Sequence, residues 1–257
     1  MEDEIALGGN ISGAVRVGET VRRRPGPWTP AVHALLEYLA QQGLEVPRPV
    51  GFDERGREVL SYIEGQAVPG WPDPFPAWIF SEDCLRVAVR GLRRYHDLVE
   101  GFTPTVGAEW RMPAPGPHEI ICHNDWAPYN AVFRDRRPDV MVDWDMASPG
   151  TRLWDAAWTA YMWIPLHPQV AGFSLQNSAD RVRTFCADYG GLSPVDLFET
   201  LLDRLRFSAE FGRAQALAGD PGFQKLVNEL DSPRMMERHA DQLERDGILR
   251  RLLGERR

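Results

Sequence analysis

A polar segment near the middle of the chain carries the residue types best suited to chemistry. Asp125 follows His123 by two positions, Asn130 comes five residues after Asp125, and Asp143 lies 13 residues beyond Asn130. Carboxylate and amide oxygens are hard ligands of the kind that Mg²⁺ takes alongside substrate phosphates. A further carboxylate beside them can orient an attacking hydroxyl. These are the parts that phosphoryl transfer needs, since catalysis of that reaction is mostly positioning and charge neutralisation.

The elements around this segment fall into two groups. Alternation and turn residues predict strands in the first sixty residues, with one helix at Thr29–Gln42 that has Thr29 as its N-cap and Gly43 as its stop. A helix at Glu82–Val99, two short strands and a run of helices follow. The strands are expected at 5–11, 14–17, 20–23, 47–52, 58–63, 130–133 and 139–142, and the later helices at about 152–164, 176–190, 194–218, 221–230 and 232–252.

A proline-rich break separates the two groups. Glu64-Gly65 and the stretch 69–76, which contains four prolines, show little periodicity, as is typical of a linker. We therefore expect an N-terminal lobe at 1–65, with a hinge at about 61–65, and a helical C-terminal lobe at 66–257.

Composition narrows the class of protein. The 257 residues are 43% apolar, enough for a real core, and the formal charge of −8 argues against a nucleic-acid binder, which needs a basic face. Three scattered cysteines without a CxxC pair favour a reducing compartment over a disulfide framework. The acidic start does not resemble a signal peptide, and no apolar run reaches the length of a membrane span. We expect a cytoplasmic protein with neither a membrane nor a nucleic-acid partner.

The order of these motifs resembles a known family. His123-x-Asp125-x4-Asn130 followed by Asp143 is similar to the catalytic loop and metal-binding Asp of the protein-kinase-like fold. A resemblance to the aminoglycoside phosphotransferase family in particular, a phosphotransferase enzyme family, rests on the stretches CHNDWAPYN, VDWDMASPG and LWDAAW. It covers nearly the whole chain and implies an α+β, two-lobed fold with a small β-rich N-lobe and a larger helical C-lobe.

The resemblance implies a role for each matching residue. Asp125 would accept or steer the proton of the substrate hydroxyl, while Asn130 and Asp143 would hold Mg²⁺. His123 and Asp155 would support the site structurally, Asp155 by bracing the catalytic loop from the helix that follows it. The nucleotide, ATP or GTP, would contact three features. Arg23 would be the phosphate anchor, and Ser61 and Ile63 would be the hinge pair. The Gly-rich turn would contribute Gly9, Asn10, Ser12 and Gly13.

Two positions depart from the family pattern. Its third strand usually carries Lys or Arg, partnered by a Glu on the next helix. Alternation makes Arg23 the candidate anchor here, with Arg22 as the next choice. The partner position falls to His33, or to Glu37 one turn later. At Asn124 the family usually has Gly, and Asn tolerates unusual backbone angles better than most residues. We expect these departures to act on nucleotide affinity and rate rather than on the fold.

For several residues the sequence allows two alternative roles. His123 is interpreted as a buried structural residue more readily than as a catalytic base, and Asp145 fits a metal contact and a turn cap equally well. Packing is favoured over ligand stacking for four aromatic residues of one expected helix, which are Trp154, Trp158, Tyr161 and Trp163. Acidic residues of the last helices could receive a cationic substrate but are typical of solvated faces; these are Glu199, Asp203, Glu210, Asp220, Glu229 and Asp231.

The favoured function is Mg²⁺-dependent transfer of the γ-phosphoryl group of ATP or GTP to a hydroxyl of a small molecule. The resemblance implies an aminoglycoside-like acceptor, with other alcohols open. The alternative is a catalytically weak, kinase-like ligand-binding or regulatory protein, which the unclear partner of Arg23 favours and the presence of Asp125, Asn130 and Asp143 disfavours. A metal-dependent hydrolase is disfavoured because no second histidine cluster has ligand spacing. The sequence indicates no oligomeric state.

Overall fold

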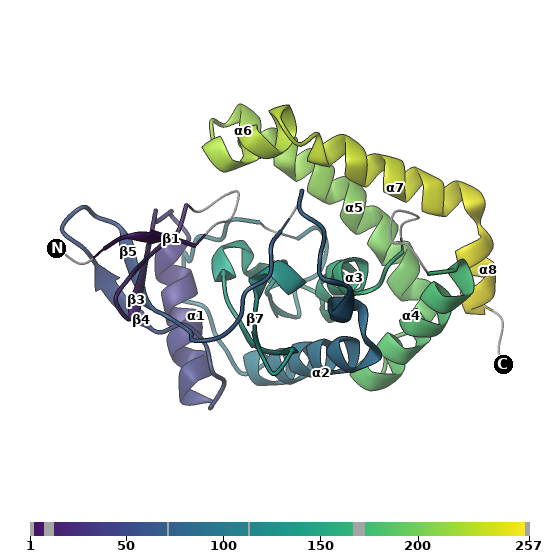
Figure 1. The fold of residues 1–257 in the computed structure, drawn as a ribbon, viewed down its shortest axis with the longest axis horizontal. Helices are drawn as coiled ribbons and strands as arrows, with labels where there is room; N and C mark the ends of the chain where they lie inside the picture. Colours follow the sequence, from purple (N-terminus) through teal and green to yellow (C-terminus); the bar gives the residue numbers. More distant parts are fainter. Residues whose placement is uncertain (1–2, 8–12, 71, 113, 167–172, 255–257) are drawn as a thin grey trace.

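The computed structural model describes residues 3–7, 13–70, 72–112, 114–166 and 173–254. A small part built on an antiparallel sheet is followed by a larger helical part, in the order that the sequence patterns predict (Figure 1). The strands are β1 (Ile5–Ala6), β2 (Val15–Val17), β3 (Thr20–Arg23), β4 (Pro49–Phe52), β5 (Glu58–Ser61), β6 (Ile120–Cys122), β7 (Ala131–Arg134), β8 (Arg137–Met141) and β9 (Ser148–Gly150). The helices are α1 (Thr29–Gln41), α2 (Glu82–Val99), α3 (Arg152–Trp163), α4 (Leu175–Tyr189), α5 (Pro194–Leu217), α6 (Pro221–Asn228), α7 (Ser232–Asp246) and α8 (Ile248–Gly254).

Five strands form the sheet of the small part, in the order β1–β2–β3–β5–β4, and every neighbouring pair is antiparallel. Across β3 and β5, Arg23 stands directly opposite Glu58. The chain leaves the sheet after β5, and Gln66 forms an antiparallel bridge with Phe133 of β7. The sheet and the β7–β8 hairpin are therefore tied together close to the expected hinge.

Three expectations about element boundaries are corrected. Thr29 is not the N-cap of α1: Trp28 holds that position, and the Thr29 hydroxyl accepts a hydrogen bond from Gly26 N–H at 2.9 Å. The expected helix at 232–252 is two helices, because Gly247 adopts φ +54° between α7 and α8. The short strands β6 and β9 were not predicted from the sequence, since three residues give too little alternation to recognise.

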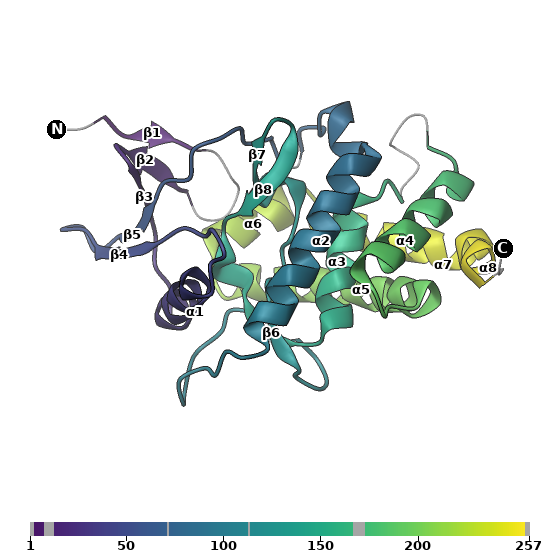
Figure 2. The same cartoon turned by 90° about the horizontal axis from the view of Figure 1, so that it is seen from below.

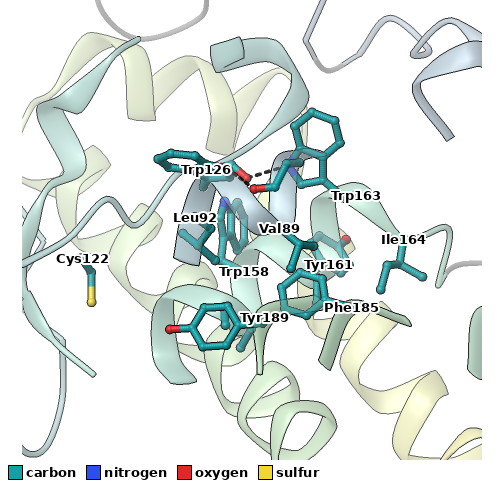
Figure 3. Close-up of a cluster of buried hydrophobic side chains, with 14 of the residues drawn as sticks. Val89, Leu92, Cys122, Trp126, Trp158, Tyr161, Trp163, Ile164, Phe185 and Tyr189 are labelled. Carbon is teal, nitrogen blue, oxygen red and sulfur yellow. Dashed lines mark hydrogen bonds between the residues drawn. The ribbon is translucent and has the colours of Figure 1, made fainter. Parts of the chain in front are cut away.

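The helical part is organised around α3. This helix packs against α2 and α5, while α5 packs against α7 and α4 packs against α2 and α8 (Figure 2). Nearly all of α3 is buried, so the packing interpretation of its aromatic residues is confirmed. The indole N–H of Trp163 donates to the carbonyl of Trp126 at 2.9 Å within the aromatic cluster (Figure 3). No helix in the described ranges is both long and apolar enough to cross a membrane.

Candidate active site

The ladder between β6 and β9 brings the two ends of the polar segment together. Cys122 at the end of β6 lies opposite Ser148 at the start of β9. Between them the chain makes the loop 123–130 and the β7–β8 hairpin. The carbonyl of Asn130 accepts a hydrogen bond from Val142 N–H at 2.8 Å, which brings Asp143 next to Asn130. The two residues expected to hold a metal therefore lie side by side.

Asp125 lies at the centre of this arrangement and accepts hydrogen bonds from three side chains. Tyr129 Oη donates to Oδ1 at 2.6 Å, Trp158 Nε1 donates to Oδ1 at 2.9 Å, and Asn130 Nδ2 donates to Oδ2 at 2.8 Å. Burial opposes ionisation more strongly than these bonds favour it, and it raises the pKa of Asp125 to about 6. A carboxylate with a raised pKa is suited to accept a proton near neutral pH.

Asp155 lies directly beneath the loop. Its fully buried carboxylate accepts hydrogen bonds from the backbone N–H groups of His123 and Asn124, both at 2.8 Å. His96 Nε2 is 3.0 Å from the same carboxylate. Burial disfavours the charge, but these contacts outweigh it and lower the pKa of Asp155. The hydrogen bonds are those that a residue bracing the loop requires.

His123 and Asn124 shape the loop from within. The His123 ring is fully buried, and its Nδ1 accepts a hydrogen bond from Asp125 N–H at 3.2 Å. Burial lowers the pKa of His123 to about 4, so the ring is neutral at pH 7. Asn124 adopts φ +64°, and its Nδ2 donates to Met146 O at 3.0 Å and to Ser148 Oγ at 2.8 Å. An asparagine therefore fits this left-handed position and links the loop to β9.

Arg23 occupies the centre of a buried charge cluster, and its partner is not the one expected. Arg23 Nε donates to Glu58 Oε2 at 2.5 Å, and His33 Nε2 lies 2.6 Å from Glu58 Oε1. The acid therefore comes from β5 rather than from the following helix. His33 contacts that acid instead of replacing it, and Glu37 lies exposed. Cross-strand pairing explains the correction, because Glu58 faces Arg23 directly in the sheet.

The same guanidinium reaches the helical part. Arg23 Nη1 donates to Asp143 Oδ1 at 2.9 Å, and Nη2 lies 2.6 Å from Asp145 Oδ1. Burial disfavours the charge on Arg23, but the three carboxylates outweigh it and raise its pKa. Burial also raises the pKa of Asp145 to about 6. Asp145 thus forms an ion pair with the anchor, a role that neither of its two interpretations from sequence included.

The donor atoms around Asn130 and Asp143 fit a hard cation. The amide nitrogen of Asn130 donates to Asp125, which leaves the amide oxygen for a metal. Asp143 adopts φ +57°, and its side chain is 36% exposed, so one of its oxygens can be reached while the other accepts from Arg23. The described ranges hold no group of three or more His, Cys, Asp or Glu residues arranged for a metal. Phosphate oxygens of a nucleotide and water would supply the other ligands of Mg²⁺.

The expected nucleotide contacts are only partly described. Gly9, Asn10 and Ser12 lie outside the described residues, and Gly13 adopts φ +58° at the start of the strand segment that follows. Ser61 ends β5, where its N–H donates to Arg48 O and its Oγ accepts from Arg48 N–H. Ile63 lies two residues further, on the path from the sheet to β7.

Sequence reasoning missed four residues that contact the site. Tyr129 was given no role and Trp158 was assigned to packing, yet both donate to Asp125. Glu58 carried a signal, because it is a charged residue in an otherwise apolar strand. Arg204 on α5 donates from Nη2 to the carbonyl of Asn124 at 2.9 Å, and nothing in the local pattern distinguishes it from the other arginines of that helix.

Residues 88–192 match the model of the phosphotransferase enzyme family. The resemblance seen in the sequence is confirmed. The trifolitoxin immunity protein of Rhizobium leguminosarum bv. trifolii is 39% identical over 158 residues, which are 58% of this chain and 58% of that protein. The aligned part thus spans 58% of the length of that relative, less than two thirds of it.

Several solved structures share the fold of this chain. Amicoumacin kinase hAmiN, in complex with AMP-PNP, Ca²⁺ and Ami, matches with a TM-score of 0.67 at 13% identity over 95% of this chain and 88% of its own. A choline/ethanolamine kinase family protein from Mesorhizobium loti matches with a TM-score of 0.62 at 16% identity, covering 98% and 91%. The GDP complex of aminoglycoside 2'-phosphotransferase-IIIa matches with a TM-score of 0.61 at 12% identity, covering 94% and 93%. The expected α+β, protein-kinase-like fold is confirmed.

Proposed function

We propose that this protein is a Mg²⁺-dependent phosphotransferase that moves the γ-phosphoryl group of ATP or GTP to a hydroxyl of a small molecule. One observation carries the proposal: distant parts of the chain converge on Asp125. Asn130 bonds to Asp125, Asp143 lies beside Asn130, and Arg23 of the sheet bonds to Asp143. The nucleotide would lie between the two parts, with the hinge at 61–65 and the lobes at 1–65 and 66–257.

Each residue then has a defined task. Asp125 Oδ2 accepts one protein hydrogen bond and has room for the acceptor hydroxyl, whose proton it takes. Asn130 and Asp143 would hold Mg²⁺, which neutralises phosphate charge when bound. Arg23, kept in place by Glu58, would neutralise the phosphates of the nucleotide. Asp155 and His123 would keep the loop in position.

We propose an antibiotic or toxin as the acceptor. The relative named as a toxin immunity protein and the solved kinases of antibiotics support this class. A polycationic acceptor is less well supported, because several acids of the last helices already form ion pairs with arginines. Glu199 lies 2.6 Å from Arg250, and Asp220 lies 2.7 Å from Arg111. The side chains around Asp125 are aromatic, with Phe75 stacked on Tyr129 at 6.3 Å, so an acceptor with apolar surface fits better.

The test compares nucleotide turnover in the parent protein and in Asp125→Asn. The parent should convert ATP or GTP to the diphosphate only with Mg²⁺, slowly with water as acceptor and faster with a matching antibiotic or toxin. Asp125→Asn should fold, bind nucleotide and lose turnover by on the order of 10² or more. Asp83→Asn, the same change at an exposed residue of α2 that pairs with Arg137, is the control and should keep full turnover.

The other outcomes separate the two functions. Mg²⁺-dependent nucleotide binding without turnover in the parent would favour a kinase-like binding protein. Undiminished turnover in Asp125→Asn would remove Asp125 from its role and contradict the proposed mechanism.

A further inference from the structure

Arg204 of α5 is a buried cation without an acidic partner in the described part of the chain. It is 1% exposed, and its hydrogen bonds go from Nη2 to the carbonyl of Asn124 at 2.9 Å and from Nη1 to the sulfur of Met112 at 3.9 Å. Its buried Nε finds no hydrogen-bond acceptor among the described residues. Burying a charge without a counter-ion is expensive, and an apolar side chain would pack there at lower cost. A purely structural role does not account for the charge.

Aromatic rings offset part of that cost. The guanidinium carbon lies 5.0 Å from the ring centroid of Trp154, 5.2 Å from that of Trp158 and 5.8 Å from that of Phe207. Cations are attracted to aromatic faces, and the attraction strengthens when water is excluded. Burial lowers the pKa of Arg204 to about 10, so the side chain is still charged at neutral pH.

Two contacts of Arg204 converge on Asp125. Through Nη2 it holds the carbonyl of Asn124, the residue immediately before Asp125. Through its planar face it packs against Trp158, whose Nε1 donates to Asp125 Oδ1 at 2.9 Å. The guanidinium therefore touches both the backbone that carries Asp125 and the indole that orients its carboxylate.

We propose that Arg204 is a positioning residue that fixes the orientation of the Asp125 carboxylate. The proposal rests on the proposed function of Asp125. Only a planar, charged donor can bond to a carbonyl with one edge while stacking on indoles with its faces.

The test follows the indole N–H resonance of Trp158 by NMR, assigned by its loss in Trp158→Phe. In Arg204→Met this resonance should move or broaden, because the indole loses its cation and the hydrogen bond to Asp125 is disturbed. Arg204→Lys keeps the charge without the planar fork and should move the resonance less. Arg206→Met is the matched control on the same helix, since Arg206 pairs with Glu244 on the surface at 2.5 Å, and it should leave the resonance unchanged.

Kinetics supply the second measurement. Arg204→Met should lower kcat for Mg²⁺–nucleotide turnover by about tenfold or more, with KM for the nucleotide within about twofold of the parent. Because a smaller folded fraction would also lower the apparent kcat at constant KM, kcat is expressed per folded molecule, with the folded fraction measured by circular dichroism. An unchanged Trp158 resonance in Arg204→Met, or in Arg204→Lys if the first variant does not fold, overturns the proposal, as does an unchanged kcat. If the parent itself has no turnover, the proposed function fails, while the resonance still decides the role of Arg204.

Discussion

Asp155 and Arg23 are both buried charges, but the contacts that hold them differ in kind. Asp155 accepts hydrogen bonds from backbone N–H groups of the loop and from His96 of α2, so its partners are the loop backbone and one neighbouring helix. Arg23 is held by the carboxylates of Glu58, Asp143 and Asp145, which come from the sheet and from the end of the β7–β8 hairpin. The loop is held by hydrogen bonds to its backbone, whereas Arg23 is held by ion pairs with three carboxylates.

This difference indicates which half of the site must change during function. The backbone N–H groups of His123 and Asn124 in the loop are bonded to Asp155, a residue of the protein itself. At the anchor, a nucleotide and Mg²⁺ would bring new charges to Arg23 and Asp143, and the present pairing between them would have to be redistributed. We expect nucleotide binding to act on the anchor and to leave the loop unaltered.

The largest loss of unfolding free energy is expected from a substitution of Arg23. Arg23→Met removes the guanidinium that joins three acids, although Arg111 still lies 3.6 Å from Asp145. Breaking buried ion pairs in this way costs about 3–5 kcal/mol of unfolding free energy. Urea unfolding measures the loss. Arg55→Met removes an exposed arginine whose partner is Glu4, and it should cost about 1 kcal/mol or less. Similar losses in both variants would show that the cluster is not the charge-balanced centre described here.

A smaller loss of unfolding free energy is expected from a substitution of Asp155, beneath the loop. Asp155→Asn removes one acceptor for the backbone N–H groups and the charge that strengthens the bonds, at a cost of about 2–3 kcal/mol. Asp83→Asn, at an exposed residue that pairs with Arg137, is the control and should cost about 1 kcal/mol or less. Hydrogen exchange should show that the protection of His123 and Asn124 N–H falls only in Asp155→Asn. Unchanged protection would separate Asp155 from the loop.

The loop should also set the acidic limb of the pH profile. The pKa of Asp125 is raised to about 6 by burial, and the carboxyl must be ionised to accept a proton. Turnover should therefore rise through pH 6 and fall about tenfold between pH 7 and pH 5. Initial rates at saturating nucleotide measure this limb. A midpoint near 4, the ordinary range of an aspartic acid, would contradict the burial described for Asp125.

The smallest change in unfolding free energy is expected at Asn124. Comparing two variants there distinguishes the cost of the left-handed backbone from the loss of the side-chain hydrogen bonds. A residue with a Cβ is disfavoured at φ +64°, and Ala keeps that cost while losing both side-chain bonds. Asn124→Ala should therefore be about 1 kcal/mol less stable than Asn124→Gly. Urea unfolding of the two variants checks the order, and a reversed order would show that the left-handed backbone does not matter here.

Much of the fold followed from the sequence because its signals are local. The helical spacing of α2 and the turn at Gly18 were visible without tertiary information, as was the motif that contains Asp125 and Asn130. The family resemblance then supplied the arrangement of the lobes. Boundaries failed where local signals compete: Trp28 rather than Thr29 caps α1, and Gly247 interrupts an otherwise continuous helical pattern.

The site was less predictable, because its missed contacts are not local. Glu58 reaches Arg23 across a sheet whose strand order the sequence does not reveal. Trp158 donates to Asp125 from a helix 33 residues later, and Arg204 contacts Asn124 across 80 residues. Spacing along the chain identifies residues on one loop or one helix face, but it cannot identify partners that only the packing of α3 and α5 brings together.

The central claim is that the cluster of Arg23, Glu58, Asp143 and Asp145 forms one side of a Mg²⁺–nucleotide site. The most direct test is thermal unfolding with ATP and with GTP, with and without Mg²⁺, for the parent, Asp143→Ala and the control Asp139→Ala on β8. At nucleotide a hundredfold above Kd, the parent and the control should gain about 2.7 kcal/mol, only with Mg²⁺, and Asp143→Ala should gain little. No stabilisation of the parent by either nucleotide, or equal stabilisation in Asp143→Ala, would contradict the account.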